Sequence, residues 1–152
     1  MIIPDVNLLL YCYDSSSPFH TKSATWWQEC LSAAEPVGLP PVVLFGFVRI
    51  ATHARVFQHP MTVVEAAGHV RSWLAQPCAQ VLEGRAEDVE KVLELLEGLG
   101  AAGNLVTDAQ IAALAIEHDA VLHTADSDFL RFPRLRWFNP LTGVASAKLR
   151  RT

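Results

Sequence analysis

The sequence predicts an α/β domain with a central, mostly parallel sheet. Short apolar segments, which are candidate strands, alternate along the chain with longer segments of helical pattern. At 152 residues, of which 51% are apolar and 18% charged, the chain is long enough for one domain with its own core. We expect a single domain over residues 1–141, followed by a basic, frayed tail at residues 142–152.

The first candidate strand leads into Asp5, and a helix is expected from about Val6. Side chains of a buried parallel strand are nearly all apolar, so a carboxylate at its end is unusual. Open α/β sheets bind ligands in the crevice at the carboxyl ends of their strands. Asp5 therefore has two interpretations: an acid of a ligand site at that crevice, or the N-cap of the following helix.

Periodicity and end signals predict the other elements. Helices are expected over residues 20–34, 42–54, 63–75, 86–99 and 107–118, and strands over residues 37–39, 80–83, 120–124 and 135–138. Pro41 suits the start of the second of these helices. Capping boxes, in which side chain and backbone bond each other reciprocally, are expected at Thr62–Glu65 and at Thr107–Gln110.

The net charge of −4 argues against a nucleic-acid partner, but the charges are unevenly distributed. No acid occurs between Pro36 and Val64, and none follows Asp128, whereas six acids fall within residues 83–97. After Asp128 the basic residues are Arg131, Arg134, Arg136, Lys148, Arg150 and Arg151. These groups can border a nucleic-acid site, or they can simply be solvated.

The sequence carries no sign of a membrane segment or a secretion signal. No apolar run approaches the roughly 18 residues that span a membrane, and the N-terminus lacks a basic region. We therefore expect a cytoplasmic protein without membrane contact. The three cysteines, Cys12, Cys30 and Cys78, have apolar neighbours and are expected to be buried free thiols.

Several common catalytic motifs are excluded. Residues 98–103 spell G-x-G-x-x-G, but they follow an amphipathic helix rather than a strand, so a helix C-terminus explains them better than a dinucleotide site. No serine lies in a G-x-S-x-G motif, and the six histidines show no H-E-x-x-H spacing.

The aspartates remain as candidates. Asp108 is expected in the first turn of a helix, and Asp126 and Asp128 directly follow a buried strand. Each has an ordinary explanation, in helix-terminus electrostatics or turn chemistry. In an open α/β sheet, however, strand C-termini and helix N-termini share one edge, where these acids would meet Asp5. Two carboxylates ~4 Å apart repel by roughly 4 kcal/mol at an effective dielectric of ~20, so a divalent cation such as Mg²⁺ or Mn²⁺ is the natural occupant.

Five segments together resemble the PIN-domain proteins of the VapC toxin family. Asp5–Tyr11 resembles the opening of these proteins, and residues 103–109 and 124–129 resemble their later acidic motifs. Residues 45–52 and 136–141 are similar to one VapC subgroup. The five motifs occur in the family's order and cover the chain from Ile2 to about Leu141.

The resemblance implies a PIN-like three-layer α/β/α sandwich and a metal-dependent endoribonuclease, the toxin of a type II toxin–antitoxin pair. It implies Mg²⁺ or Mn²⁺ as cofactor, an RNA substrate, an antitoxin partner and a homodimer. The implied metal ligands are Asp5, Asp108 and Asp126, with Asp128 as a further catalytic acid. Asn7, Thr107 and Thr124 would orient the carboxylates. Candidate RNA-binding residues at the border of this acidic site are Arg49, Arg55, Arg131, Arg134 and Arg136.

One departure from the family pattern leaves alternatives open. Many PIN domains carry a Glu in the helix after the second strand, where this chain has Gly46. A PIN-like domain that binds RNA or a partner without cleaving it is therefore a second hypothesis. An aspartyl-phosphate phosphohydrolase is a third, although Asn7 stands where such enzymes usually need a second Asp. Phe19, Trp26 and Trp27 can serve a partner contact or belong to the core.

Overall fold

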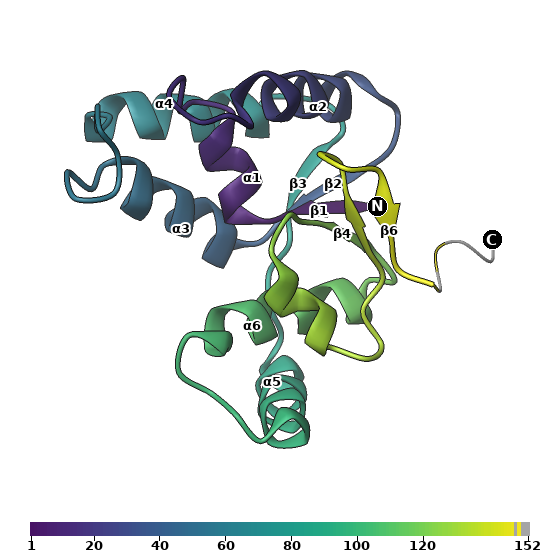
Figure 1. The fold of residues 1–152 in the computed structure, drawn as a ribbon. Coiled ribbons are helices and arrows are strands. Elements are labelled where there is room, and N and C mark those ends of the chain that lie inside the picture. Colours follow the sequence, from purple (N-terminus) through teal and green to yellow (C-terminus); the bar gives the residue numbers. More distant parts are fainter. Residues whose placement is uncertain (148, 150–152) are drawn as a thin grey trace.

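A computed structural model describes residues 1–147 and 149. Six strands form one sheet in the order β3-β2-β1-β4-β5-β6, with β1 and β4 at its centre (Figure 1). Their bounds are β1 Ile2–Pro4, β2 Val37–Leu39, β3 Ala79–Val81, β4 Val121–His123, β5 Trp137–Asn139 and β6 Val144–Ala145. The first five pair in parallel, and only β6 runs antiparallel to its neighbour. The predicted mostly parallel α/β sheet is therefore confirmed.

The helices form a layer on each side of this sheet (Figure 1). One layer holds α1 Val6–Tyr11, α2 His20–Ser32, α3 Pro41–Ala51 and α4 Val63–Leu74, and the other holds α5 Ala86–Leu99 and α6 Leu105–Glu117. A short 3-10 helix, η1 Ser127–Arg131, follows β4. Because β1 to β5 are parallel, their carboxyl ends and the N-termini of α1, α3 and α6 come to one edge of the sheet.

The core lies on both sides of the sheet, under α1 to α4 on one side and under α6 on the other. Ile3, Leu8 and Leu9 are fully buried. Phe47 and Trp73 pack edge to face, with their ring centroids 4.7 Å apart. Trp26 and Trp27 are also buried, which assigns them to the core, whereas Phe19 is exposed. Cys12 and Cys30 are buried free thiols as predicted, and Cys78 is half-buried. No helix within the described ranges is both long and apolar enough to cross a membrane.

Local capping groups fix two of the predicted helix ends, the start of α4 and the end of α5. The side chain of Thr62 accepts a bond from the backbone N–H of Glu65 at 3.2 Å, and the Glu65 carboxylate accepts one from the Thr62 N–H at 2.7 Å. Gly100, which follows α5, has φ of 62°, a left-handed conformation that favours glycine and ends the helix. The interpretation of residues 98–103 as a helix C-terminus is therefore confirmed.

Thr62→Ala should lower the free energy of unfolding by about 1 kcal/mol, because it removes one partner of the capping box. Denaturant unfolding of both proteins measures this difference. Thr25→Ala is the matched control, since Thr25 is an exposed threonine inside α2 and alanine favours a helix interior. A loss for Thr25→Ala equal to that for Thr62→Ala would contradict the capping role.

Two expectations from the sequence were wrong, and one expected strand is present with shifted bounds. No capping box forms at Thr107–Gln110, because α6 begins two residues earlier, at Leu105, with Asn104 in the N-cap position. The strand expected over residues 80–83 is shorter and spans Ala79–Val81. The tail expected to fray from Thr142 contributes β6, whose pairing with β5 places Val144 opposite Asn139. Of the basic tail residues, Lys148, Arg150 and Arg151 lie outside the described part of the chain.

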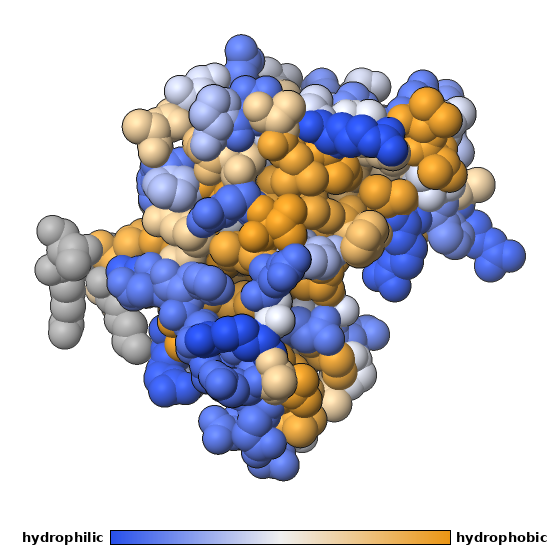
Figure 2. All heavy atoms as spheres, turned by 180° about the vertical axis from the view of Figure 1, so that it is seen from behind, coloured by the Kyte–Doolittle hydropathy of each residue, from blue (hydrophilic) through white to orange (hydrophobic). Residues whose placement is uncertain are grey.

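An apolar groove of about 430 Å³ opens between α3 and α4 and reaches the edge strand β3. Its lining includes Leu44, Phe45, Val70, Leu74 and Val81. Figure 2 shows apolar surface running across the molecule seen from behind, from the region of α3 and α4 toward α5. Phe45 is 72% exposed and Val81 is 44% exposed. An apolar surface of this kind marks a face that a partner commonly covers.

Candidate functional site

Asp5 occupies the carboxyl end of the central strand β1. Its backbone N–H donates to His123 O of β4 at 2.9 Å, which extends the pairing of the two strands past Pro4. Its carboxylate accepts a hydrogen bond from the Thr124 hydroxyl at 2.9 Å. Asp5 holds the N-cap position of α1, but its side chain makes no capping bond. This geometry favours the interpretation of Asp5 as an acid of a site over that of a helix cap.

The Asp5 carboxylate is only 4% exposed, and its protonation reflects this environment. Burial raises the pKa of Asp5 to about 7, because the charged form loses its hydration. The hydrogen bond from Thr124 acts against this rise, whereas the charges of Asp108 and Asp126 add to it. The charged form of Asp5 therefore needs a compensating positive charge.

Asp108 reaches the same region from the first turn of α6. Burial raises the pKa of Asp108 to about 6, and the charges of Asp126 and Asp128 contribute further. Three elements thus bring carboxylates together: the end of β1, the start of α6 and the segment after β4. The sequence-based expectation that these acids converge at one edge agrees with this electrostatic coupling.

Asp126 and Asp128 are held by short-range hydrogen bonds in the segment after β4. The backbone N–H of Asp126 donates to the Thr124 hydroxyl oxygen at 2.9 Å, and the Asp128 N–H donates to Asp126 Oδ1 at 2.9 Å. Asp126 is half-buried and Asp128 is exposed. Thr124 therefore connects Asp5 with the backbone of Asp126, while Asp128 lies at the outer side of the group.

A cavity of about 640 Å³ opens beside Asp5 and Asp108. Its opposite wall comes from α3, including Phe45, Gly46 and Arg49. A Cβ atom added at Gly46 would lie 3.1 Å from Val6 Cγ2, so α3 approaches α1 closely at this point. The helix that carries an acid in many PIN-like chains thus presents a glycine and an exposed arginine here.

The donor set fits a hard divalent cation only in part. Carboxylate oxygens are the ligands that Mg²⁺ and Mn²⁺ prefer, and the pKa values of Asp5 and Asp108 are raised in part by the charge of Asp126. Yet among the described residues no three Asp, Glu, His or Cys side chains stand close enough to form a preformed metal cage. A Mg²⁺ ion usually keeps several waters and binds through one or two carboxylates, so the arrangement suits an ion held partly by water and substrate.

The neutral polar residues expected to orient the carboxylates differ in their contacts. Asn7 and Thr107 line the cavity with Asp5 and Asp108. In the described part of the chain neither side chain hydrogen-bonds a carboxylate, whereas Thr124 does so with Asp5. Thr124 is 1% exposed, so this hydrogen bond is shielded from water.

Thr124→Val is expected to reduce whatever activity depends on Asp5 by about tenfold or more. It keeps the size of the side chain but removes the donor to Asp5 and the acceptor for the Asp126 N–H. Thr124→Ser keeps the hydroxyl and is the matched control. The activity and the melting temperature of both variants are measured. An equal loss of activity in Thr124→Val and Thr124→Ser would refute this role of the hydroxyl.

The five arginines expected at an RNA border do not all lie near the acids. Arg49 lines the cavity, and Arg55 is exposed in the connection after α3. Arg131 and Arg134 are exposed at and after the end of η1. Arg136 pairs with Asp119 Oδ1 at 2.7 Å before the start of β5, at the opposite edge of the sheet. The structure therefore does not bring Arg136 to the site.

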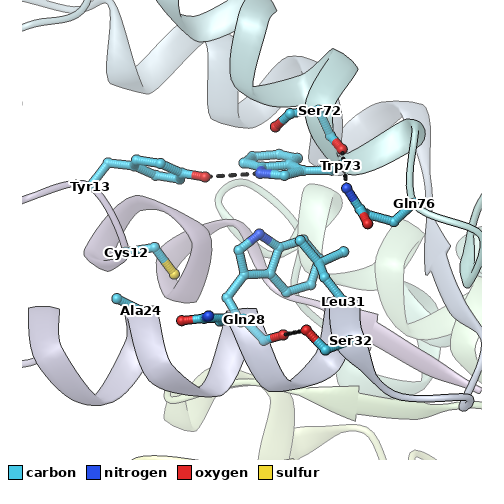
Figure 3. Close-up of a pocket in the computed structure, with 10 residues that line it drawn as sticks. Cys12, Tyr13, Ala24, Gln28, Leu31, Ser32, Ser72, Trp73 and Gln76 are labelled. Carbon is cyan, nitrogen blue, oxygen red and sulfur yellow. Dashed lines mark hydrogen bonds between the residues drawn. The ribbon is translucent and has the colours of Figure 1, made fainter.

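A second recess, of about 350 Å³, lies between the end of α1, α2 and α4 (Figure 3). The Trp73 indole N–H donates to the Tyr13 hydroxyl at 2.9 Å, and Gln28, Ser72 and Gln76 surround this pair. Burial raises the pKa of the nearby Cys12 thiol to about 12, which keeps it protonated and unreactive. The described residues that line this recess include no Asp, Glu or His.

Comparisons with known proteins relate the chain to one family and to solved structures of the same fold. The family model of the PIN domain matches residues 2–135. Ribonuclease VapC33 of Mycobacterium tuberculosis is 45% identical over 141 residues, which cover 93% of this chain and 99% of the relative. Ribonuclease VapC37 of the same species is 39% identical, with 92% and 97% covered.

Two solved structures illustrate the likeness of fold. VapBC2 of Rickettsia felis, bound to a promoter DNA fragment, superposes with a TM-score of 0.66 at 19% identity, covering 91% of this chain and 98% of the other. Mycobacterium tuberculosis VapC20, described as a toxin that cleaves the sarcin–ricin loop, also gives a TM-score of 0.66, at 16% identity, with 86% and 93% covered. At these identities the likeness concerns the fold.

Proposed function

The chain belongs to the PIN-domain family and, within it, to the VapC ribonucleases, and from this premise we propose that its carboxylates support metal-dependent RNA cleavage. It is a ribonuclease toxin of a VapBC toxin–antitoxin system. The observation that carries the proposed mechanism is the coupling of Asp5, Asp108 and Asp126 at the carboxyl edge of the sheet. Mg²⁺ or Mn²⁺ is the cofactor that we propose for them.

The chain's own residues have separable roles in this mechanism. Asp5, Asp108 and Asp126 would hold the cation, and Asp128, which is exposed beside Asp126, would accept a proton or a hydrogen bond from solvent. The chemistry that a bound ion supplies is a water of lowered pKa and charge neutralisation on the phosphoryl oxygens. Thr124 orients Asp5 through its hydroxyl, and Asn7 and Thr107 stand where they can contact substrate or metal-bound water.

RNA must approach an acidic site, so basic groups at its border lower the repulsion. We propose Arg49 as the first of these, because it lines the same cavity as Asp5 and Asp108 and forms no ion pair with a described acid. Arg55, Arg131 and Arg134 are exposed and can contact the RNA backbone farther away.

Two protein partners are part of the proposal. The similar structures from Rickettsia felis and from Klebsiella pneumoniae are toxin–antitoxin complexes, and we propose an antitoxin for this chain as well. A homodimer is proposed through the apolar groove between α3 and α4, because Phe45 and Val81 are exposed there. The edge strand β3 ends the sheet on that side.

The test is cleavage of structured RNAs by the purified chain with Mg²⁺, with Mn²⁺ and with a chelator. Cleavage that requires the metal supports the proposal. Binding of RNA without cleavage, at an affinity that metal does not change, would instead favour the PIN-like domain that binds without cutting. That alternative has one structural observation in its favour, the absence of an acid at Gly46.

A further inference from the structure

A smaller recess, of about 220 Å³, lies on the other side of the acids from the cavity at α3. Its lining includes Thr124 and Asp126 from the segment after β4, Leu130 of η1, and Trp137 and Asn139 of β5. Nothing in the proposed mechanism uses this recess. It nevertheless shares Asp126 with the acidic group, so a molecule bound there would touch the site.

The register of the sheet explains why the recess adjoins the acids. Leu122 pairs with Trp137, so the side chains of Thr124 and Asn139, two residues farther along, project from the same face. Asn139 in turn pairs with Val144 of β6. A row across the carboxyl edge of the sheet therefore runs from Asp5 through Thr124 to Asn139 and Val144. Asn139 lies two strands from Asp5, a separation of roughly 10 Å.

The lining residues are unusual for a surface beside four carboxylates. Leu130 is 53% exposed and Val144 is 44% exposed, and the half-buried Trp137 adds an aromatic ring. The Oδ1 atom of Asn139 accepts a bond from the Leu141 N–H at 2.9 Å, and no described residue accepts a bond from the amide N–H groups of Asn139, which can donate to a ligand. The recess thus combines an aromatic ring, an apolar rim and hydrogen-bond donors.

We propose that this recess holds a nucleobase of the RNA, next to the phosphodiester bond that is cut at the acids. Single-stranded bases stack on aromatic side chains and are distinguished by hydrogen bonds to their edges, which Trp137 and Asn139 can provide. The shared wall at Asp126 places such a base beside the reacting phosphate. This inference rests on the proposed ribonuclease function and specifies how that function selects its substrate.

The first experiment measures base preference at the cleavage site with short RNAs randomised on both sides of the cut. Trp137→Ala should weaken the preference for the favoured base by roughly tenfold, and Trp137→Phe should retain it. Leu130→Ala changes an exposed side chain at the rim and should weaken the preference without loss of folding. Phe19→Ala, an exposed aromatic residue outside the recess, is the control that should leave both rate and preference unchanged.

A second measurement does not depend on cleavage. An oligoribonucleotide carrying 5-iodouridine is bound to the Asp108→Ala variant, irradiated, and the crosslinked peptide is identified by mass spectrometry. A crosslink to the segment that contains Trp137 supports the proposal. A crosslink confined to α3 overturns it, because the base would then occupy the larger cavity.

The outcomes separate this inference from the function on which it rests. Metal-dependent cleavage with an unchanged base preference in Trp137→Ala and Leu130→Ala overturns the nucleobase recess alone. Absence of any RNA binding and cleavage by the wild type removes the function and the recess together. If Trp137→Ala weakens capture of the antitoxin but not RNA selection, the recess is a protein contact and the proposal is wrong.

Discussion

Asp5→Ala is expected to reduce metal-dependent RNA cleavage by about a thousandfold. Asp5 is buried at the end of β1, interacts electrostatically with Asp108 and Asp126, and accepts a hydrogen bond from Thr124, so its removal takes away the central carboxylate of the proposed site. The loss corresponds to about 4 kcal/mol in the activation free energy, within the range of several kcal/mol that a metal ion supplies to phosphoryl transfer. Single-turnover cleavage of a structured RNA measures it.

Two further variants make this result specific. Asp108→Ala removes the second carboxylate of the same cavity and should cause a loss of similar size. Glu90→Ala removes an exposed acid of α5 without an ion pair among the described residues, and should leave the rate unchanged. Full activity of Asp5→Ala, in a protein that melts as a folded domain, would rule out a catalytic role for this edge of the sheet.

The fold and the location of the acids could be predicted because both follow from local patterns. The strand that ends at Asp5, the helix over Ala86–Leu99 and the capping box at Thr62 each depend on residues close in sequence. The convergence of Asp5, Asp108 and Asp126 then follows from topology, since parallel strands bring their carboxyl ends to one edge.

What the sequence did not reveal depends on tertiary contacts. Arg136 resembles any other basic residue near the acids until its ion pair with Asp119 places it at the opposite edge. The segment at Thr107 has the residues of a capping box, but the helix starts two residues earlier, at Leu105. A local pattern cannot determine which turn is the first turn of the helix. The recess at Trp137 requires the pairing of β5 with β4 and β6, which no local pattern encodes.

The free energy of unfolding of the metal-free protein should fall as the pH rises from about 4 to about 7. The pKa of Asp5 is 3.8 in an ordinary environment and about 7 in the folded chain, so between these values the folded state binds more protons than the unfolded state. The contribution of Asp5 to the free energy of unfolding is fully present below pH 3.8, the pKa in the unfolded chain. It is lost as the pH rises through about 7, the pKa in the folded chain. The contribution is at most about 4 kcal/mol, since one pKa unit corresponds to 1.36 kcal/mol.

Denaturant unfolding at a series of pH values, with and without Mg²⁺, measures this linkage. Asp5→Asn carries no charge at position 5, so it should flatten the pH dependence and be more stable than the wild type at pH 8 without metal. Mg²⁺ should stabilise the wild type at pH 8 and much less at pH 5.5, because the ion must then displace protons from Asp5 and Asp108. Asp5→Asn should lose most of this metal effect.

One result would contradict this prediction. If the free energy of unfolding of the wild type rises from pH 5 to pH 7, and rises more steeply than that of Asp5→Asn, then Asp5 is ionised in the folded protein without a cation. The apolar, closely packed end of β1 argues against that outcome, because among the described residues the Thr124 hydroxyl is the one side-chain donor to a carboxylate at this position.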